Sequence, residues 1–368
     1  MFLKPQISGP QRSPGLFPVL RLHFLSIWFL MHLSMASPNA KTSKKAGLGT
    51  AAPNRGPRNP VTDRVAYAVV RLFLLLFRHL PGGVARWIGR RMGDAAFICS
   101  PRYRRQMIHH LDIAYRHELS REEKERICRL NFQHLGLFLV EFSRMHWLTK
   151  ENAHELVDVS QFRVLDKLLV RPRGLIAVPG HLGNWEMCGY VASLLGYPLK
   201  SVARPLDNPL LNEMVDTIRE TSGNTIIHKW QVLWKLKKLL DHKGIVTMSV
   251  DQNGGVGGVF APLFGIQSST IASPAELHLA TRAPIVVATL NRLPDGVRHV
   301  FNVWDVIEFE KTGDYDADRL AIVTRINAAY EKAIRQYPEQ WLWVHRRWKT
   351  RPEGEKPGPD GMPPRTNN

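Results

Sequence analysis

The sequence predicts an α/β fold, a sheet with crossover helices, preceded by a helical segment. Two patterns support this prediction. From Arg173 onward, short β-branched apolar runs alternate with helical stretches, which is typical of a sheet whose strands are joined by helices. Residues 84–150 instead carry apolar and charged residues at helical spacing. With 368 residues, the chain can bury one large core or two modest ones.

The strands expected in the α/β body are apolar runs bounded by Gly, Pro and polar residues. They cover residues 174–178, 198–203, 225–228, 245–250, 285–290, 300–303 and 305–309. Helices are expected at 182–195, 209–222, 231–242, 273–282 and 316–337. The glycine-rich run 254–258 lacks the spacing of a nucleotide-binding loop, so we expect a flexible lid or a loop that contacts lipid.

Composition changes along the chain predict four segments. They are a disordered leader at 1–60, a helical membrane-associated platform at 61–150, the α/β body at 151–352 and a disordered tail at 353–368. Within the leader, the apolar stretch 22–33 is followed by Ser34-Met35-Ala36. It can be a secretory signal, a first membrane anchor, or the product of a start upstream of the true one, for which Met35 is a candidate.

Residues 65–80 form a second apolar stretch, interrupted by Arg71 and Arg78. A helix that crosses a bilayer needs about 20 apolar residues, which this stretch does not supply. We therefore expect a helix in the membrane interface, with its arginines reaching anionic headgroups. A helix packed in the protein core is the alternative.

The formal net charge of +18 is the strongest global signal in the composition. Such a charge suits nucleic acid, anionic lipid headgroups or an acidic partner protein. The sequence contains no zinc-finger spacing or other nucleic-acid motif, so no nucleic acid is expected. The three cysteines are odd in number and widely spaced, which predicts reduced thiols in a reducing compartment.

The predicted site centres on His181, which follows the strand 174–178 and the breaking pair Pro179-Gly180 and precedes a helix. Helix N-termini expose N–H groups and favour developing negative charge. Glu186 can meet His181 only if the histidine lies in the loop and the glutamate on the first helical turn. Two further His-x4-Glu pairs lack a preceding strand and are expected to be surface residues: His117/Glu122 and His146/Glu151.

Arg204 and Asp251 also follow predicted strands. Sites in open α/β sheets collect at the carboxyl ends of strands. Considered alone, Arg204 could be an ordinary surface arginine and Asp251 a turn or cap residue. Together with His181 and Glu186, they predict a functional constellation.

These residues allow direct acyl transfer. The sequence has no G-x-S-x-G motif, and Cys188 lies in an apolar helix where core packing is expected. His181 can take a proton from a hydroxyl near neutral pH, and Glu186 can orient its imidazole. Backbone N–H groups at the helix start, with Arg204, can hold an oxyanion. No metal and no cofactor are expected beyond an acyl thioester as co-substrate.

Four segments resemble the bacterial lipid A biosynthesis lauroyl/myristoyl acyltransferases and occur in that family's order. They are PGHLGNWE at 179–186, ARPLDNP at 203–209, Asp251-Gln252 with Phe264-Gly265, and EQWLWVHRRWK at 339–349. The resemblance spans residues 61–352. It implies a glycerolipid acyltransferase-like mixed sheet flanked by helices, with an N-terminal helical membrane-associated platform.

The resemblance also implies a function. A fatty acyl chain would pass from acyl carrier protein to a hydroxyl of an anionic lipid A precursor, at the cytoplasmic face of the inner membrane. His181 and Glu186 match the family's His-x4-acid pair, which implies base and partner. The implied substrate-binding residues are Asn184, Arg204, Asp251 and Gln252.

Three tryptophans stand among basic residues in the last of these segments: Trp341, Trp343 and Trp348. Such a mixture suits a membrane interface, and core packing is the alternative. The chain departs from the family in its long basic leader and in the glycine content of its loop at 254–260.

Other functions stay open at this stage. The same chemistry could act on a lysophospholipid or a mannosylated phosphoinositide, and coenzyme A could replace the carrier protein as donor. A hypothesis from outside the enzymes is a basic protein that binds membranes or nucleic acid without catalysis.

Overall fold

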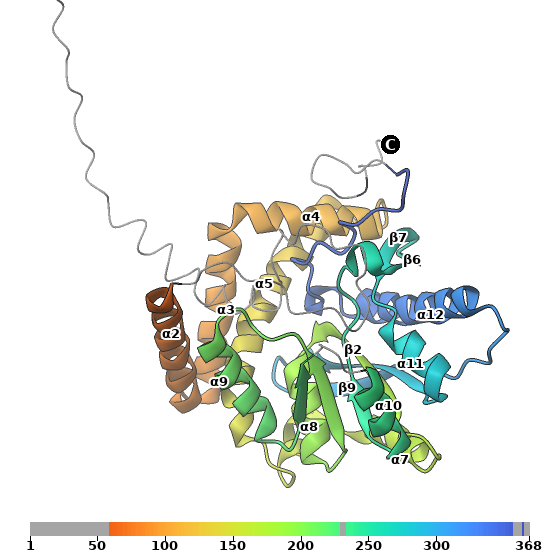
Figure 1. The fold of residues 1–368 in the computed structure, drawn as a ribbon. Helices are drawn as coiled ribbons and strands as arrows, with labels where there is room; N and C mark the ends of the chain where they lie inside the picture. The colour runs from red at the N-terminus through yellow and green to blue at the C-terminus, as the bar shows by residue number, and fades with distance from the viewer. Residues whose placement is uncertain (1–58, 229–232, 356–362, 364–368) are drawn as a thin grey trace, which may run out of the picture.

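The computed structural model describes residues 59–228, 233–355 and 363. In Figure 1, the N-terminal helices stand beside a body built around one large sheet. Strands alternate with helices along this body, which confirms the predicted α/β class. The predicted leader lies outside the described residues except for Asn59 and Pro60, and so does most of the predicted tail.

The large sheet has seven strands in the order β1-β9-β8-β2-β5-β3-β4. Neighbouring strands run parallel except β8 and β9, which pair antiparallel, so the sheet is mixed. Strand β2 lies at its centre. The strand bounds are β1 Val157–Asp158, β2 Leu175–Gly183, β3 Leu199–Ala203, β4 Thr225–His228, β5 Ile245–Thr247, β8 Ile285–Arg292 and β9 His299–Ile307.

Helices cover both faces of the sheet because successive strand residues point to opposite sides. Ile176 and Val178 of β2 share one apolar cluster with α10, α11 and α12. Leu175 belongs to a second cluster, with α7, α8 and α9, on the other face. The bounds of these helices are α7 Arg163–Leu169, α8 Trp185–Leu194, α9 Pro209–Glu220, α10 Leu233–Asp241, α11 Ser273–Thr281 and α12 Tyr315–Gln336.

Four helices precede the body, as the spacing of apolar residues predicts. They are α2 Pro60–His79, α3 Gly82–Cys99, α4 Pro101–Tyr115 and α5 Arg121–Arg144. Asn59 caps α2, and Ser120 with Glu123 forms a capping box at the start of α5. Among the described residues, no helix combines the length and the apolar content that crossing a bilayer requires.

Short elements complete the fold. They are the helix α6 Ala153–Leu156 and the 3₁₀ turns η1 Met145–Trp147, η2 Ser160–Phe162, η3 Gly255–Gly257 and η4 Pro338–Gln340. The turn η3 lies in the glycine run for which the sequence predicts a flexible lid or a loop that contacts lipid. It is held by Ser269, whose Oγ donates to the carbonyl O of Gly255 at 2.5 Å.

Three elements differ from the sequence prediction. Strand β2 continues to Gly183, so His181 lies in the strand and not in a loop. The two strands expected between residues 300 and 309 are one strand, β9. After the glycine run, an antiparallel hairpin was missed, β6 Val259–Leu263 and β7 Ile266–Thr270. Its polar residues Ser268, Ser269 and Thr270 are buried, so the strand lacks the alternation that sequence patterns detect.

Helices α3 and α5 pack closely because glycines stand at their contact. Gly89 and Gly93 of α3 face Gly136 and its neighbours on α5. A Cβ atom on Gly93 would lie 2.5 Å from both the carbonyl O of Phe132 and the Cα of Gln133. Non-bonded atoms do not normally approach so closely, so a larger residue would push the two helices apart.

We expect Gly93→Ala to lower the free energy of unfolding by about 1–3 kcal/mol, the usual cost of overpacking. Urea-induced unfolding measures this difference. Gly83→Ala is the matched control on the same helix, because no side chain or other element of the described structure lies within 4 Å of its Cβ position. We expect the control to be unchanged or slightly more stable. Equal stability of Gly93→Ala and the unmodified protein would contradict the close approach of the helices.

Candidate active site

Three neighbouring parallel strands, β3, β5 and β2, bring polar residues to one edge of the sheet. His181 lies near the C-terminal end of β2, Asp251 follows β5, and Arg204 directly follows β3. The carboxyl ends of parallel strands meet at the same edge. Three residues that are distant in sequence are therefore placed at one edge of the fold.

His181 and Asp251 make contact at two points. The backbone N–H of His181 donates to Asp251 Oδ2 at 2.7 Å, and His181 Nδ1 lies 2.7 Å from Asp251 Oδ1. Trp341 Nε1 donates to the same Oδ2 at 3.0 Å. The Asp251 side chain is 2% exposed, whereas that of His181 is 14% exposed. The aspartate is therefore buried beneath a histidine whose ring reaches solvent.

The charge of Asp251 fixes which ring nitrogen of a neutral His181 carries the proton. Burial alone would raise the pKa of Asp251, but the His181 ring and the hydrogen bonds from His181 and Trp341 outweigh it and hold this pKa below its usual value. An ionised carboxylate only accepts hydrogen bonds, so Nδ1 carries the proton when the ring is neutral. Nε2 then keeps a lone pair that can take a proton from a substrate.

Glu186 does not hold the imidazole, which corrects the sequence prediction. It lies on the first turn of α8, but its carboxylate accepts hydrogen bonds from Arg219 Nε and Nη2 at 2.8 and 2.7 Å. Because His181 continues the strand, its N–H and ring face Asp251, four residues beyond the end of β5. Burial raises the pKa of Glu186, while the charges of Arg219 and then His181 lower it to below its usual value. Glu186 is thus within electrostatic reach of the ring, and its catalytic role stays a prediction.

Asn184 is buried and engaged, which argues against its predicted contact with a substrate. Its side chain has no exposed surface. As the cap of α8, Asn184 accepts the Met187 N–H at Oδ1 over 2.9 Å, and its Nδ2 donates to Glu141 Oε2 at 2.8 Å. Asn184 therefore fixes the start of α8 directly after β2.

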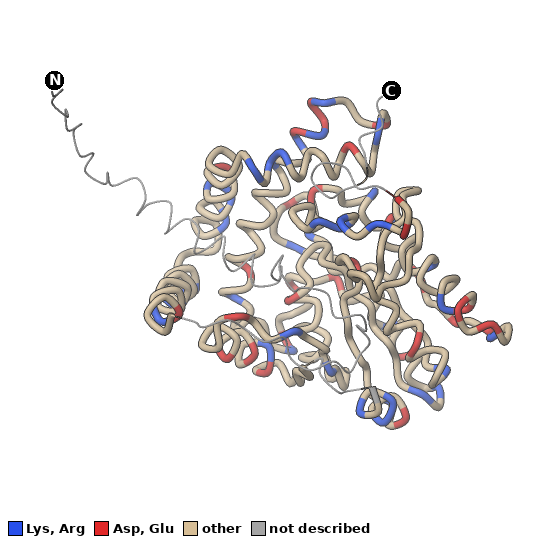
Figure 2. The backbone as a smooth tube through the Cα atoms, turned by 45° about the horizontal axis from the view of Figure 1, so that its top comes forward, with Lys and Arg blue, Asp and Glu red and all other residues tan. Residues whose placement is uncertain are grey.

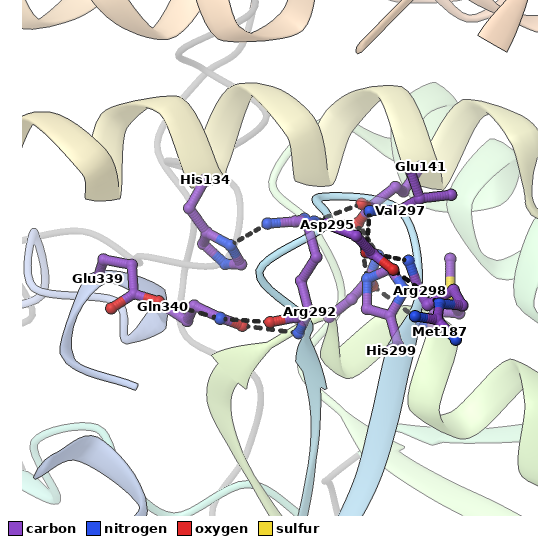
Figure 3. Close-up of polar contacts among 11 residues, drawn as sticks. His134, Glu141, Met187, Arg292, Asp295, Val297, Arg298, His299, Glu339 and Gln340 are labelled. Carbon is purple, nitrogen blue, oxygen red and sulfur yellow. Dashed lines mark hydrogen bonds and ion pairs between the residues drawn. The ribbon is translucent and has the colours of Figure 1, made fainter. Parts of the chain in front are cut away.

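A buried ion pair, shown in Figure 3, supports this end of the sheet. Arg292 of β8 donates to both carboxylate oxygens of Glu141 on α5, at 2.6 and 2.7 Å. Burial raises the pKa of Glu141, but Arg292 and His299 lower it well below its usual range. Burial and the Arg292 charge lower the pKa of His134, whose Nδ1 lies 2.6 Å from Arg292 Nη1. A neutral His134 accepts that hydrogen bond.

Gln340 ties the same strand to the C-terminal part of the chain. The Arg292 N–H donates to Gln340 Oε1, and Gln340 Nε2 donates to the Arg292 carbonyl O, both at 2.9 Å. Figure 3 shows Gln340 and Glu141 reaching Arg292 from different elements. Removing either Glu141 or Arg292 would leave the other charge buried without its partner, which is strongly destabilising. The network therefore holds α5, β8 and η4 together next to β2.

Two of the predicted substrate-binding residues keep partly exposed side chains. Gln252 Nε2 lies 3.4 Å from His181 Nε2, the nitrogen that faces away from Asp251. The Arg204 side chain is partly exposed, and its Nη2 lies 3.3 Å from Asp207 Oδ1. Asp251 is too deeply buried for the substrate contact predicted for it, and it orients His181 instead.

The tryptophans of the C-terminal segment are buried, so the expected membrane interface is wrong and the alternative of core packing is correct. Trp341, Trp343 and Trp348 are 3%, 0% and 0% exposed. Sequence reasoning missed the hydrogen bond from Trp341 to Asp251. No local spacing could reveal a contact across 90 residues, and the only signal was that both residues lie in segments resembling one family.

Cys188 packs in the core, as predicted. Burial raises the pKa of its thiol to about 12. A thiol with such a pKa is a poor nucleophile, because the thiolate is the reactive form. Cys128 is also buried with a thiol pKa raised to about 12, and all three cysteines are free.

Comparison with known proteins places the chain in a family. The sequence profile described as bacterial lipid A biosynthesis acyltransferase matches residues 57–350. The chain is 28% identical over 284 residues to the lipid A biosynthesis palmitoleoyltransferase of Escherichia coli (strain K12), covering 77% of this chain and 90% of that protein. It is 27% identical to the lauroyltransferase of the same strain, with 76% and 90% covered. The lipid A biosynthesis acyltransferase of Haemophilus influenzae is 25% identical over 244 residues, with 65% and 76% covered.

The profile matches most of the chain, and the two Escherichia coli relatives are covered over 90% of their length. The resemblance inferred from four short segments is therefore confirmed. The relatives are acyltransferases by name, which agrees with a site that offers a proton acceptor and no thiol nucleophile. The protein is an acyltransferase and belongs to the bacterial lipid A biosynthesis acyltransferase family.

Proposed function

We propose that this enzyme transfers a fatty acyl chain from an acyl thioester to a hydroxyl of a lipid A precursor, with His181 as the general base. The observation that carries the proposal is the His181–Asp251 contact, which leaves Nε2 of a partly exposed imidazole unprotonated, with the Gln252 amide nitrogen 3.4 Å away. The family and the names of its members support the acceptor class.

The reaction needs one proton acceptor that later becomes a donor. His181 Nε2 takes the proton of the acceptor hydroxyl while the hydroxyl oxygen attacks the thioester carbonyl carbon. The tetrahedral intermediate then breaks its C–S bond, and the imidazolium returns the proton to the departing sulfur. Asp251 stabilises the imidazolium and keeps Nδ1 protonated. Gln252, 3.4 Å from Nε2, is placed to contact the reacting groups.

We propose acyl carrier protein as the donor because the basic surface suits an acidic partner. Figure 2 shows Lys and Arg along the outer helices, and the net charge of the chain is +18. Complementary charge speeds the encounter of two proteins. Helices α3 and α4 carry two aspartates against six arginines, Arg86, Arg90, Arg91, Arg102, Arg104 and Arg105.

We propose that the outer face of α2 rests on the inner membrane, with the catalytic side toward the cytoplasm. Val70, Phe73 and Phe77 face the protein core, so one side of the helix packs as the core alternative expects. The opposite face exposes large apolar side chains next to arginines that recur every seven residues. Its exposed residues are Val61, Val65, Leu72, Leu75 and Leu76, with Arg64, Arg71 and Arg78.

The direct test of the reaction is product mass. Purified enzyme is incubated with a lipid A precursor and with either an acyl carrier protein thioester or a coenzyme A thioester. We expect one added fatty acyl group on the precursor, formed faster with the carrier protein. Acylation of a lysophospholipid or a mannosylated phosphoinositide, with the precursor left unchanged, would contradict the proposed acceptor.

We expect His181→Ala to lower kcat by about 10²–10⁴-fold, the usual contribution of a general base. Asp251→Asn should also lower kcat by about 10²–10⁴-fold, because the amide favours the wrong tautomer of the ring. Asp318→Asn is the matched control, since Asp318 is equally buried and bonds Thr312 at the start of α12. Steady-state rates of these three variants and of Glu186→Gln, with their melting temperatures, test the assignment. Unchanged kcat in Asp251→Asn, beside complete loss in Glu186→Gln, would return the orienting role to Glu186.

We expect Leu72→Asp to weaken binding to vesicles that contain phosphatidylglycerol by about tenfold or more, given the free energy of burying one leucine. Leu72 is 70% exposed on α2. Leu320→Asp is the control, because Leu320 is a 43% exposed leucine on α12. Co-sedimentation with vesicles measures both. Equal binding of the two variants would show that α2 does not carry the membrane contact.

A further inference from the structure

The C-terminal segment 341–350 contacts both halves of the candidate site. Trp341 pairs with Leu182 in an isolated antiparallel bridge, and the Leu342 N–H donates to the carbonyl O of His181 at 3.0 Å. The same segment reaches the loop that follows Asp251. It therefore touches β2 on one side and the residues after β5 on the other.

We propose that Trp341 and His345 are positioning residues, which hold Asp251 and its loop in the geometry that the His181 base requires. The inference rests on the proposed acyl transfer and adds to it the residues that set its geometry. Neither side chain has to touch the substrate for this role.

Trp341 acts on the carboxylate itself. Its indole N–H donates to Asp251 Oδ2, the oxygen that also accepts the His181 backbone N–H. With two donors on Oδ2, the other oxygen, Oδ1, is left for His181 Nδ1 at 2.7 Å. The indole is buried, so water does not compete for the carboxylate on this side. Loss of the indole N–H would leave the carboxylate held by His181 alone.

His345 acts on the loop. Its Nε2 accepts the backbone N–H of Asn253 at 2.8 Å. Burial lowers the pKa of His345 to about 3, so its ring is neutral and can accept this hydrogen bond. Asn253 follows Asp251 and Gln252 directly, which means that the bond anchors the residues beside the His181 ring.

Neighbouring side chains of the segment strengthen this anchor. Arg347 donates to the carbonyl O of Gln252 at 3.2 Å and to that of Ser269. Asn253 Nδ2 donates to Thr350 Oγ1 at 2.9 Å. Each of the three consecutive residues 251–253 is thus hydrogen-bonded to the segment. Asp251 and Gln252 accept, and Asn253 donates. Because the loop is bonded at each of these residues, the position of Asp251 relative to His181 is fixed. A misplacement of a catalytic group by about 1 Å can lower the rate by about 10²-fold.

Trp341→Phe and Trp343→Phe form a matched pair. Both tryptophans are buried and each donates one indole hydrogen bond, Trp341 to Asp251 and Trp343 to the carbonyl O of Pro338 at 2.6 Å. We expect Trp341→Phe to lower kcat by about 10–100-fold with KM changed less than about twofold. Trp343→Phe should keep kcat within about twofold of the unmodified enzyme, although both variants lose stability. Equal kcat in the two variants would overturn the role of Trp341.

His345 is tested by loss and rescue. His345→Leu removes the acceptor, whereas His345→Gln can place a carbonyl oxygen near the position of Nε2. We expect a fall in kcat of about 10–100-fold in the leucine variant and recovery to within about threefold in the glutamine variant. No loss in the leucine variant, or no recovery in the glutamine variant, would overturn the role of His345.

Amide hydrogen exchange separates this inference from the proposed reaction. The full chain is used without substrate, so the measurement does not depend on catalysis. We expect faster exchange of the Asn253 amide in His345→Leu and unchanged exchange in Trp343→Phe. If the unmodified enzyme acylates no lipid, the proposed function fails while this result still decides whether His345 anchors the loop. Unchanged exchange in His345→Leu would contradict the anchor, whatever the activity.

Discussion

The contact between His181 and Asp251 is the constraint on which the site depends. It joins the ends of two neighbouring parallel strands and uses the backbone as well as the ring of His181. The register of β2 against β5 therefore sets the position of the proposed base. The paired residues are 175–177 of β2 and 245–247 of β5, and His181 and Asp251 each lie four residues beyond them. A buried carboxylate also needs partners, and Asp251 accepts hydrogen bonds from the His181 N–H and ring and from the Trp341 indole.

Buried polar groups around this contact are themselves hydrogen-bonded, and they hold the neighbouring elements in place. On one side, Glu141 and Arg292 link α5 to β8, and Asn184 joins the same carboxylate to the start of α8. On the other, the C-terminal segment closes over Asp251. Burying charge costs free energy, and it is tolerated where hydrogen bonds meet the charged atoms. The site is thus held by long-range contacts, whereas α2, at the edge of the molecule, leaves one apolar face exposed.

Local patterns predicted most helices and strands, because caps, apolar spacing and β-branched runs act over a few residues. The partner of His181 could not be predicted in this way. The preceding strand and the His-x4-acid match pointed to Glu186, but strand order places β5 beside β2, and the arginine that pairs with Glu186 lies 33 residues away. The same limit applies to the C-terminal tryptophans, whose basic neighbours suggest an interface although packing buries them. The hairpin β6–β7 was missed because Thr270 is a buried polar residue whose partner, Arg347, is far along the chain.

The most direct test of the central claim is the tautomer of His181, read from ¹⁵N NMR of histidine-labelled enzyme at a pH where the ring is neutral. We expect the proton on Nδ1 and a bare Nε2, with this preference lost in Asp251→Asn. A proton on Nε2 in the unmodified enzyme would contradict the account, because that nitrogen could not then accept the proton of a hydroxyl.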